Sequence, residues 1–200
     1  MRMDNVITTI VGEKLEGLVA NYIGTLAAPN GYLYGISEID TRQVAKFNPI
    51  DKSMTRIGSD LGSGRTKWHK GAMTGSGIIY CPPIGSLRGI LKMYTNTDTV
   101  TELELWGLWE SCAAALDGCI YFMPDTARKI MKLDPNNGNT FSSVRDDLGS
   151  TLHKYNGTVV GIDGCVYGIS CFSKRILKYD PMNDITSFVG EEADELYLCG

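Results

Sequence analysis

Four copies of one short pattern decide the fold, and the clearest of them reads Asp117-Gly118-Cys119-Ile120-Tyr121. The other three copies are Asn30-Gly31-Tyr32-Leu33-Tyr34, Ser76-Gly77-Ile78-Ile79-Tyr80 and Asp163-Gly164-Cys165-Val166-Tyr167. Their glycines are 46, 41 and 46 residues apart, and each glycine is followed by a tyrosine three residues later. An aromatic residue also stands nine residues before each glycine. A pattern that returns in one register indicates a repeat architecture.

Each repeat is interpreted as four short strands. The first strand follows the aromatic residue and is expected at residues 23–28, 72–75, 112–116 and 158–162. The Asn-Gly, Ser-Gly and Asp-Gly pairs then predict a two-residue hairpin turn in which glycine takes a positive φ. The second strand carries the tyrosine, and the third carries a lysine that recurs at positions 46, 92, 132 and 178. The fourth strand is more polar, and the alternation over residues 100–105 is typical of a strand with one face in water.

Antiparallel units of four strands at this spacing predict an all-β fold, a β-propeller. The small residues Ala113, Ala114 and Ala115 fit the crowded inner strand of a blade. A solenoid is the competing fold, but no segment shows the sustained apolar spacing of a helix. Residues 1–200 are expected to form a single propeller domain, with blades near 18–58, 66–105, 108–145 and 153–190.

The two ends of the chain also match the repeat. Residues 7–12 resemble the outer strand at 185–190, so 6–12 is expected to be an orphan outer strand. Residues 195–200 are expected to begin a further blade. A ring of six or seven blades at this period needs about 270 to 310 residues. We therefore expect about four blades plus flanking partial strands in an incomplete ring, completed by missing sequence or by another chain.

The repeat resembles the propeller repeats of the NHL-like and virginiamycin B lyase-like superfamily. The resemblance lies in Asp117-Gly118-Cys119-Ile120-Tyr121 and Lys132-Leu133-Asp134-Pro135, and it covers nearly the whole chain. It implies how the blades are built. Because that superfamily includes lyases, hydrolases and pure binding modules, it leaves the activity open. The Gly-His and Trp-Asp dipeptides of WD repeats and the Gly-Gly doublet of kelch repeats are missing.

Composition excludes several classes of protein. The formal net charge is −4, with 43% hydrophobic and 21% charged residues, which excludes a basic nucleic-acid binder and a disordered chain. No apolar run approaches the roughly 18 residues of a membrane-spanning helix, and no signal peptide is recognised, so we expect a cytoplasmic protein without a membrane partner. The six cysteines form no Cys-x-x-Cys pair and are expected to be free, mostly buried thiols.

His69 and His153 are the histidines of the chain and the candidates for catalysis. Both are expected on connections that enter an inner strand, at the mouth of the central channel. Neither has a Cys, Asp or Glu at ligand spacing along the sequence, so no metal site and no cofactor are predicted. An ordinary loop histidine is the alternative.

Two further sets of residues recur in the same register at the mouth. The aromatic set is a candidate binding surface or, alternatively, a set of packing wedges between blades; it comprises Tyr22, Trp68, Trp109 and Tyr155. The basic set could bind carboxylate or phosphate, or could pair with acids of nearby loops; it comprises Arg42, Arg88, Arg128 and Arg175, the last displaced by one residue. Asp60-Leu61-Gly62-Ser63 and Asp147-Leu148-Gly149-Ser150 are interpreted as turns.

These observations favour binding over catalysis. We expect a non-catalytic propeller module that recognises a protein or a small-molecule ligand with the loops at the channel mouth. The alternative is a propeller enzyme of hydrolase or lyase type with a metal or a histidine at that mouth. The enzyme would require acids, histidines or a divalent ion to converge there.

Overall fold

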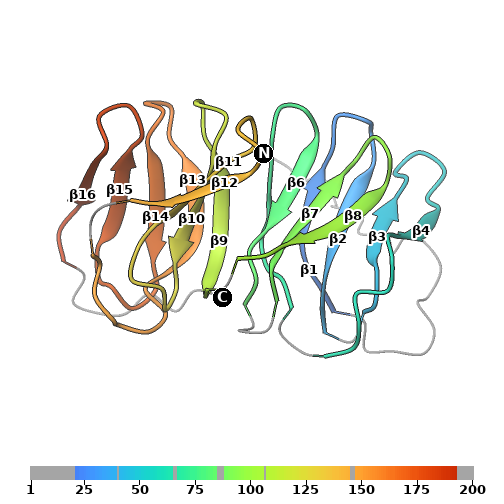
Figure 1. Cartoon of the computed structure of the whole chain (residues 1–200), viewed down its shortest axis with the longest axis horizontal. Coiled ribbons are helices and arrows are strands. Elements are labelled where there is room, and N and C mark those ends of the chain that lie inside the picture. Colours follow the sequence, from blue (N-terminus) through green and yellow to red (C-terminus); the bar gives the residue numbers. More distant parts are fainter. Residues whose placement is uncertain are drawn as a thin grey trace, which may run out of the picture.

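A computed structural model describes residues 21–39, 41–64, 67–84, 88–105, 107–144 and 147–192. These residues form four separate sheets, each of four antiparallel strands in chain order (Figure 1). Blade 1 contains β1 (Asn21–Ala27), β2 (Leu33–Ile39), β3 (Val44–Phe47) and β4 (Met54–Ile57). Blade 2 contains β5 (Ala72–Met73), β6 (Ile78–Cys81), β7 (Ile90–Tyr94) and β8 (Thr99–Leu103). Blade 3 contains β9 (Trp109–Ala114), β10 (Ile120–Pro124), β11 (Met131–Asp134) and β12 (Thr140–Ser143), and blade 4 contains β13 (Tyr155–Val160), β14 (Val166–Ser170), β15 (Ile176–Asp180) and β16 (Ile185–Val189).

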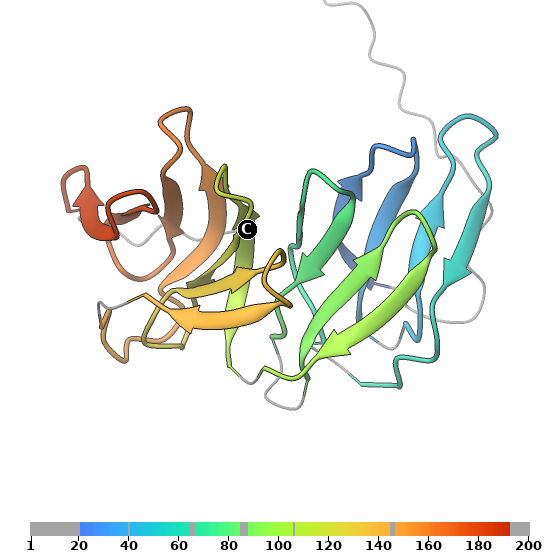
Figure 2. The same cartoon turned by 45° about the horizontal axis from the view of Figure 1, so that its top comes forward.

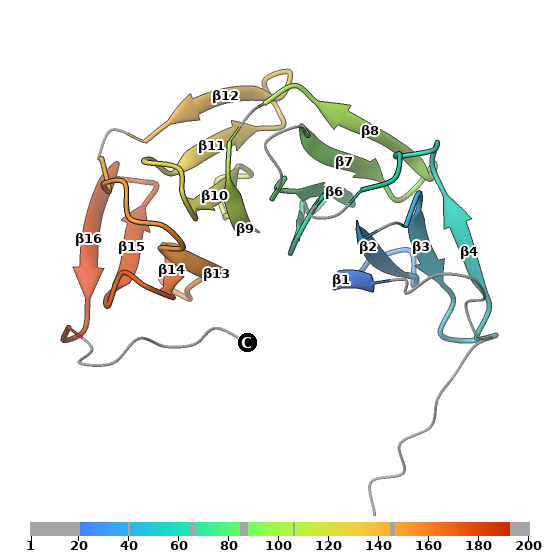
Figure 3. The ribbon, with the colours of Figure 1, turned by 90° about the horizontal axis from the view of Figure 1, so that it is seen from below.

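The four sheets stand side by side along an open arc (Figure 3). β1, β9 and β13 lie on its inner side, and β4, β8, β12 and β16 lie on its outer side. The sheets are twisted, so that the outer strands run across the direction of the inner ones (Figure 2). The described residues therefore form an incomplete β-propeller of four blades. The partial strands expected at 6–12 and 195–200 lie outside the described residues.

The first hairpin of each blade differs from the expected turn. Gly118 has a φ of +81°, and its N–H donates to the carbonyl of Ala115 at 3.0 Å. Ala115 in turn donates to the carbonyl of Cys119 at 2.9 Å, so three residues form the loop. The prediction of a two-residue turn was wrong, because only the glycine takes the left-handed conformation while Asp117 before it does not. This is a turn followed by a bulge glycine.

The inner strands of blades 1, 3 and 4 begin earlier than expected, whereas β5 of blade 2 begins at Ala72 as expected. β9 starts at Trp109 and β13 at Tyr155, rather than at residues 112 and 158. The reason is pairing with the far end of the second strand, where Trp109 lies opposite Pro124 and Tyr155 opposite Ser170. The aromatic residue is therefore part of the inner strand in these two blades, while Trp68 of blade 2 forms an isolated bridge with Pro83 before β5.

The hydrophobic core lies between neighbouring blades. Three clusters of buried side chains join blades 1 and 2, blades 2 and 3, and blades 3 and 4. The tyrosine of each second strand in blades 1 to 3 belongs to such a cluster. Five cysteines are free and buried, as expected, namely Cys81, Cys112, Cys119, Cys165 and Cys171. Within the described residues there is no helix long and apolar enough to cross a membrane.

Candidate functional site

One end of all four sheets carries the loops between second and third strands and the connections between blades, because neighbouring strands are antiparallel. We call this end the mouth face. The residue directly after the repeated aromatic lies where the inner strand begins at the mouth face, within β9 and β13 in blades 3 and 4 and shortly before β5 in blade 2. In blades 2, 3 and 4 this residue is polar, being His69, Glu110 and Asn156. Three consecutive blades therefore place a polar side chain at the same level.

Two polar contacts at this level join different blades. Nδ1 of His69 lies 3.4 Å from Oε1 of Glu110, and both side chains are largely buried. Nζ of Lys70 in blade 2 donates to Oδ1 of Asn156 in blade 4 at 2.9 Å. Blade 3, which carries Glu110, stands between blades 2 and 4 along the arc (Figure 3). The inner ends of three blades are thus linked by polar contacts.

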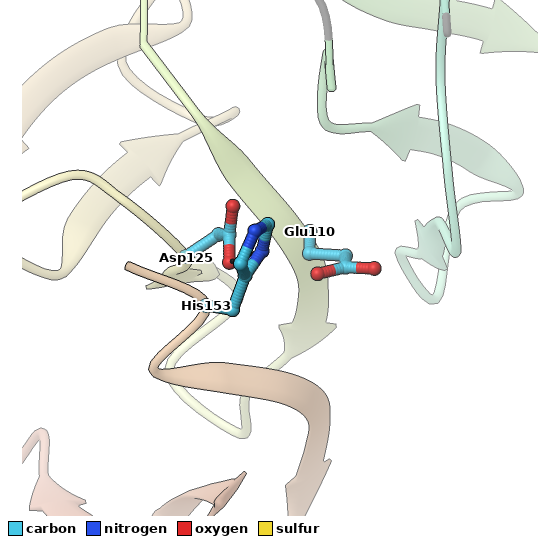
Figure 4. Close-up of side chains that lie close together, drawn as sticks. All are labelled: Glu110, Asp125 and His153. Carbon is cyan, nitrogen blue, oxygen red and sulfur yellow. Dashed lines mark hydrogen bonds and ion pairs between the residues drawn. The ribbon is translucent and has the colours of Figure 1, made fainter. Parts of the chain in front are cut away.

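Two more residues join Glu110 from neighbouring loops. Asp125 directly follows β10, and its Oδ1 lies 3.1 Å from Nδ1 of His153, on the connection from blade 3 to blade 4. Ligand-capable atoms of Glu110, Asp125 and His153 all lie within 4.8 Å of one another (Figure 4). The carboxylates are mostly shielded, with 16% of the Glu110 side chain and 11% of the Asp125 side chain exposed. The imidazole of His153 is the open side of this group, because it is 60% exposed.

The backbone holds His153 in an unusual conformation. Its φ is +51°, in the left-handed region that non-glycine residues rarely adopt. The N–H of Phe172 donates to the carbonyl of His153 at 3.1 Å, and the N–H of Lys154 donates to the carbonyl of Asp125 at 3.1 Å. Backbone contacts on both sides therefore present the imidazole to Asp125. Such a conformation persists where the surrounding structure enforces it, often at functional sites.

The buried ammonium group of Lys154 interacts with Asp125, one of the three converging residues. Lys154 is 2% exposed, and its Nζ donates to the carbonyl of Thr151 at 2.7 Å. Burial lowers the pKa of Lys154, and the carboxylate of Asp125 opposes that effect. The positive charge near Asp125 offsets part of the negative charge of the two carboxylates.

The aromatic set lies mostly inside the protein. Trp68 is 0% exposed, and Trp109 and Tyr155 are also buried, while Tyr22 is half-buried. Nε1 of Trp68 donates to the carbonyl of Gly89 at 2.9 Å, across the same blade. This burial favours the packing alternative, and a binding role for the aromatic set stays a prediction.

The basic set is paired with acids. Nε of Arg42 donates to Oδ1 of Asp60 at 2.8 Å, and Nε of Arg128 donates to Oδ2 of Asp147 at 3.0 Å. Arg88 pairs with Glu102 at 3.1 Å, and Arg175 lies 3.6 Å from Glu192. The two Asp-Leu-Gly-Ser stretches are explained by the same contacts, because Oδ1 of each aspartate also accepts the glycine N–H of its turn. Anion binding by these arginines stays a prediction.

Sequence reasoning missed Glu110 and Asp125. His69 and His153 have no acid at ligand spacing along the chain, yet in space each lies within 3.4 Å of a carboxylate. Glu110 could have been found, because it occupies the repeat position of His69. Asp125 could have been found in the same way, because it stands four residues after the repeated tyrosine, as Glu38 does in blade 1.

Comparison with known proteins gives fold similarity alone. No protein-family model and no curated protein matches the chain. A solved structure that does match is a catalytically inactive variant of virginiamycin B lyase from Staphylococcus aureus with quinupristin. It aligns with a TM-score of 0.76 and 11% identity over 94% of this chain and 62% of that one. The chain has the fold of a virginiamycin B lyase-like β-propeller.

Other structures share this lyase-like propeller fold. An auxiliary nutrient binding protein from Bacteroides ovatus aligns with a TM-score of 0.59 and 14% identity, over 86% of this chain and 48% of that one. The extracellular domain of a putative one component system from B. thetaiotaomicron aligns with a TM-score of 0.63 and 13% identity, over 88% of this chain and 22% of that one. The chain thus spans less than two thirds of each of these proteins. They include a lyase, the extracellular domain of a one component system and a nutrient-binding protein, so the shared feature is the propeller module.

Proposed function

We propose that the chain is a ligand-binding propeller module that holds its ligand at the mouth face. The observation that carries this proposal is the convergence of Glu110, Asp125 and His153 from an inner strand and two loops. The names of two nutrient-binding structures support a binding role for this kind of propeller.

The charge of the group indicates the chemistry of the ligand. Two carboxylates with little exposed surface accept hydrogen bonds and favour a positive partner. An ammonium group that reaches Glu110 and Asp125 leaves most of its water behind, and electrostatic attraction is stronger in such a site. We therefore propose a ligand with an amine or a similar cationic donor group, with His153 at the entrance.

Thermal-shift and calorimetric titration with simple amines test this proposal. Putrescine and glycine amide are the probes, and acetate is the anionic comparison. We expect saturable binding of an amine, lost in Glu110→Gln and in Asp125→Asn. Asp60→Asn is the matched control, because it removes a mouth-face carboxylate that pairs with Arg42 instead, and it should bind as the wild type does. Equal binding by Glu110→Gln, or binding of acetate alone, would refute the proposal.

A propeller enzyme of hydrolase or lyase type is the second candidate. It is favoured by two acid–histidine pairs side by side, His69 with Glu110 and His153 with Asp125. Such pairs can move protons, and two carboxylates with an imidazole suit a divalent cation. Metal analysis of the purified protein and turnover screening with added Mg²⁺ or Mn²⁺ test it. No turnover under any of these conditions would remove this candidate, and a turnover that survives in both His69→Asn and His153→Asn would show that the acid–histidine pairs do not carry it.

A further inference from the structure

Blade 4 exposes one apolar face, which we call the end face. The strand register brings its residues to one side of the sheet: Val159 lies opposite Tyr167, Tyr167 opposite Lys178, and Ile176 opposite Val189. The neighbouring positions of β14 and β15, such as Val166 and Leu177, are buried toward blade 3 instead. On the end face the aliphatic side chains are open to solvent: Val159 is 52% exposed, Ile169 39%, Ile176 37% and Val189 40%.

The same repeat positions are buried in the other blades. The counterparts of Ile176 are Val44, Ile90 and Ile130, and none of them is more than 1% exposed. The counterparts of Tyr167 are also fully buried, namely Tyr34, Tyr80 and Tyr121. In each case the following blade covers them; the ring of Tyr121, for example, lies 5.2 Å from the ring of Tyr179 in blade 4. The end face therefore carries the same kinds of residue that the following blade covers elsewhere in the protein.

Blade 1 keeps the complementary pattern at the other end of the arc. Blades 2 to 4 contact the preceding blade through an aromatic at the start of the inner strand and through apolar residues of the second and third strands. The corresponding residues of blade 1 are Tyr22, Leu33 and Phe47, which are half-buried. We call them the start face. It presents the side-chain types that cover the end-face positions elsewhere in the protein.

The hydrogen bonds of the repeated third-strand lysine are also compatible with contact between the end face and the start face. In blades 1 and 2 the repeated lysine needs an acceptor from the next blade: Nζ of Lys46 lies 2.7 Å from Oδ2 of Asp98, and Nζ of Lys92 donates to Oδ1 of Asn139 at 3.0 Å. Asp98 and Asn139 both lie in the turn between the third and fourth strands and have a left-handed φ. The corresponding residue of blade 1 is Lys52, which also has a left-handed φ but whose side chain cannot accept a hydrogen bond.

Blade 4 needs no acceptor from a neighbour. Nζ of Lys178 donates to Oδ2 of Asp163 in the same blade, at 2.8 Å. The end face can therefore pack on a blade that lacks the acceptor, and blade 1 is such a blade.

We infer that the end face of blade 4 docks on the start face of a second copy of this chain. The contact is head-to-tail, and two copies make it twice. The described blades of two copies then belong to one ring, joined head to tail. The contact repeats the interface that already joins the blades within one chain.

The mass of the full chain in solution tests this inference. Light scattering after size exclusion and sedimentation velocity over a wide concentration range should give twice the 21.9 kDa of one chain. The double variant Ile169→Lys/Ile176→Lys charges the end face, where both side chains are already exposed, and should return the mass to that of one chain. Leu116→Lys is the matched control, because Leu116 is an exposed aliphatic residue of blade 3, and it should keep the double mass.

A mixing experiment tests the head-to-tail geometry. Leu33→Lys blocks the start face and should also give single chains, with a thermal melt to show that the variant is folded. Mixing it with the Ile169→Lys/Ile176→Lys protein leaves one intact pair of faces, so a mixed dimer should form. A wild-type chain that stays single at all concentrations would overturn the inference. So would a dimer that survives both end-face and start-face variants, or a mixture that does not associate.

Discussion

At the residue scale, Asp117 shows how the repeat stabilises its own hairpin. Its Oδ2 accepts hydrogen bonds from the hydroxyl of Tyr121 at 2.7 Å and from Nζ of Lys132 at 3.3 Å. Its Oδ1 accepts the N–H of Cys119 at 3.0 Å. Burial by itself would raise the pKa of Asp117, but these three hydrogen bonds outweigh it and lower the pKa below the usual 3.8. The ionised carboxylate therefore stabilises the folded state.

The sign of this effect sets a pH-dependent prediction. An acid whose pKa is lower in the folded state contributes stability above its unfolded pKa, and that stability is lost as the pH falls through the folded value. We expect Asp117→Asn to lower the free energy of unfolding by about 1–2 kcal/mol at neutral pH. The difference from wild type should shrink once the pH falls below the usual 3.8. Urea unfolding at pH 7 and pH 3 measures both values.

Asp134→Asn is the control for this measurement. Asp134 lies in the same blade, is not one of the hydrogen-bond partners of Tyr121 or Lys132, and accepts the N–H of Asn136 in an exposed turn. Its replacement should change stability little at either pH. An Asp117→Asn loss that is equal at both pH values would contradict the role given to the charge.

At the element scale, the first hairpin of each blade depends on one glycine. Gly31 has a φ of +85°, and no atom lies within 4 Å of the Cβ that a substitution would add. Gly31→Ala therefore introduces backbone strain without a clash and should cost about 1–2 kcal/mol. Gly31→Asn should cost less, because asparagine tolerates this conformation better. Urea unfolding compares the two.

Gly75→Ala is the matched control in the corresponding turn of blade 2. It also has open space around the added Cβ, but its φ is not positive. Replacing such a glycine reduces the freedom of the unfolded chain, so this variant should be as stable as wild type or slightly more stable. Equal losses for Gly31→Ala and Gly75→Ala would show that the turn geometry is not the cause.

Elements could be predicted from the sequence where their signals are local. In blade 3 the Asp-Gly pair and the tyrosine lie within the five residues 117–121, and this short pattern correctly predicted the position of the hairpin and of the second strand. The start of β9 was missed because Trp109 pairs with Pro124, a contact across the hairpin that leaves no local mark. The candidate site was missed for a related reason: Glu110, Asp125 and His153 come from a strand and two loops, and any two of them lie at least 15 residues apart along the sequence.

At the scale of the whole molecule, stability is distributed over three interfaces between blades. Blades 2 and 3 are covered on both faces, whereas blade 4 is covered by blade 3 on one face alone in the described part of the chain. In a repeat array each unit is stabilised mainly by its neighbours, so the ends open more easily than the middle. Every residue of β10 is buried, but no residue of β16 is.

Hydrogen exchange should follow this gradient. At low protein concentration the amides of β10 (Ile120–Pro124) should exchange most slowly and those of β16 (Ile185–Val189) most quickly, because β16 is an outer strand with a single neighbour. At high concentration, docking of a second copy on the end face should slow exchange in β14 and β15 and leave β10 unchanged. Peptide-level mass spectrometry resolves these segments. Uniform exchange along the chain would instead mean that the four blades unfold as one cooperative unit, with no weak end for a second copy to protect.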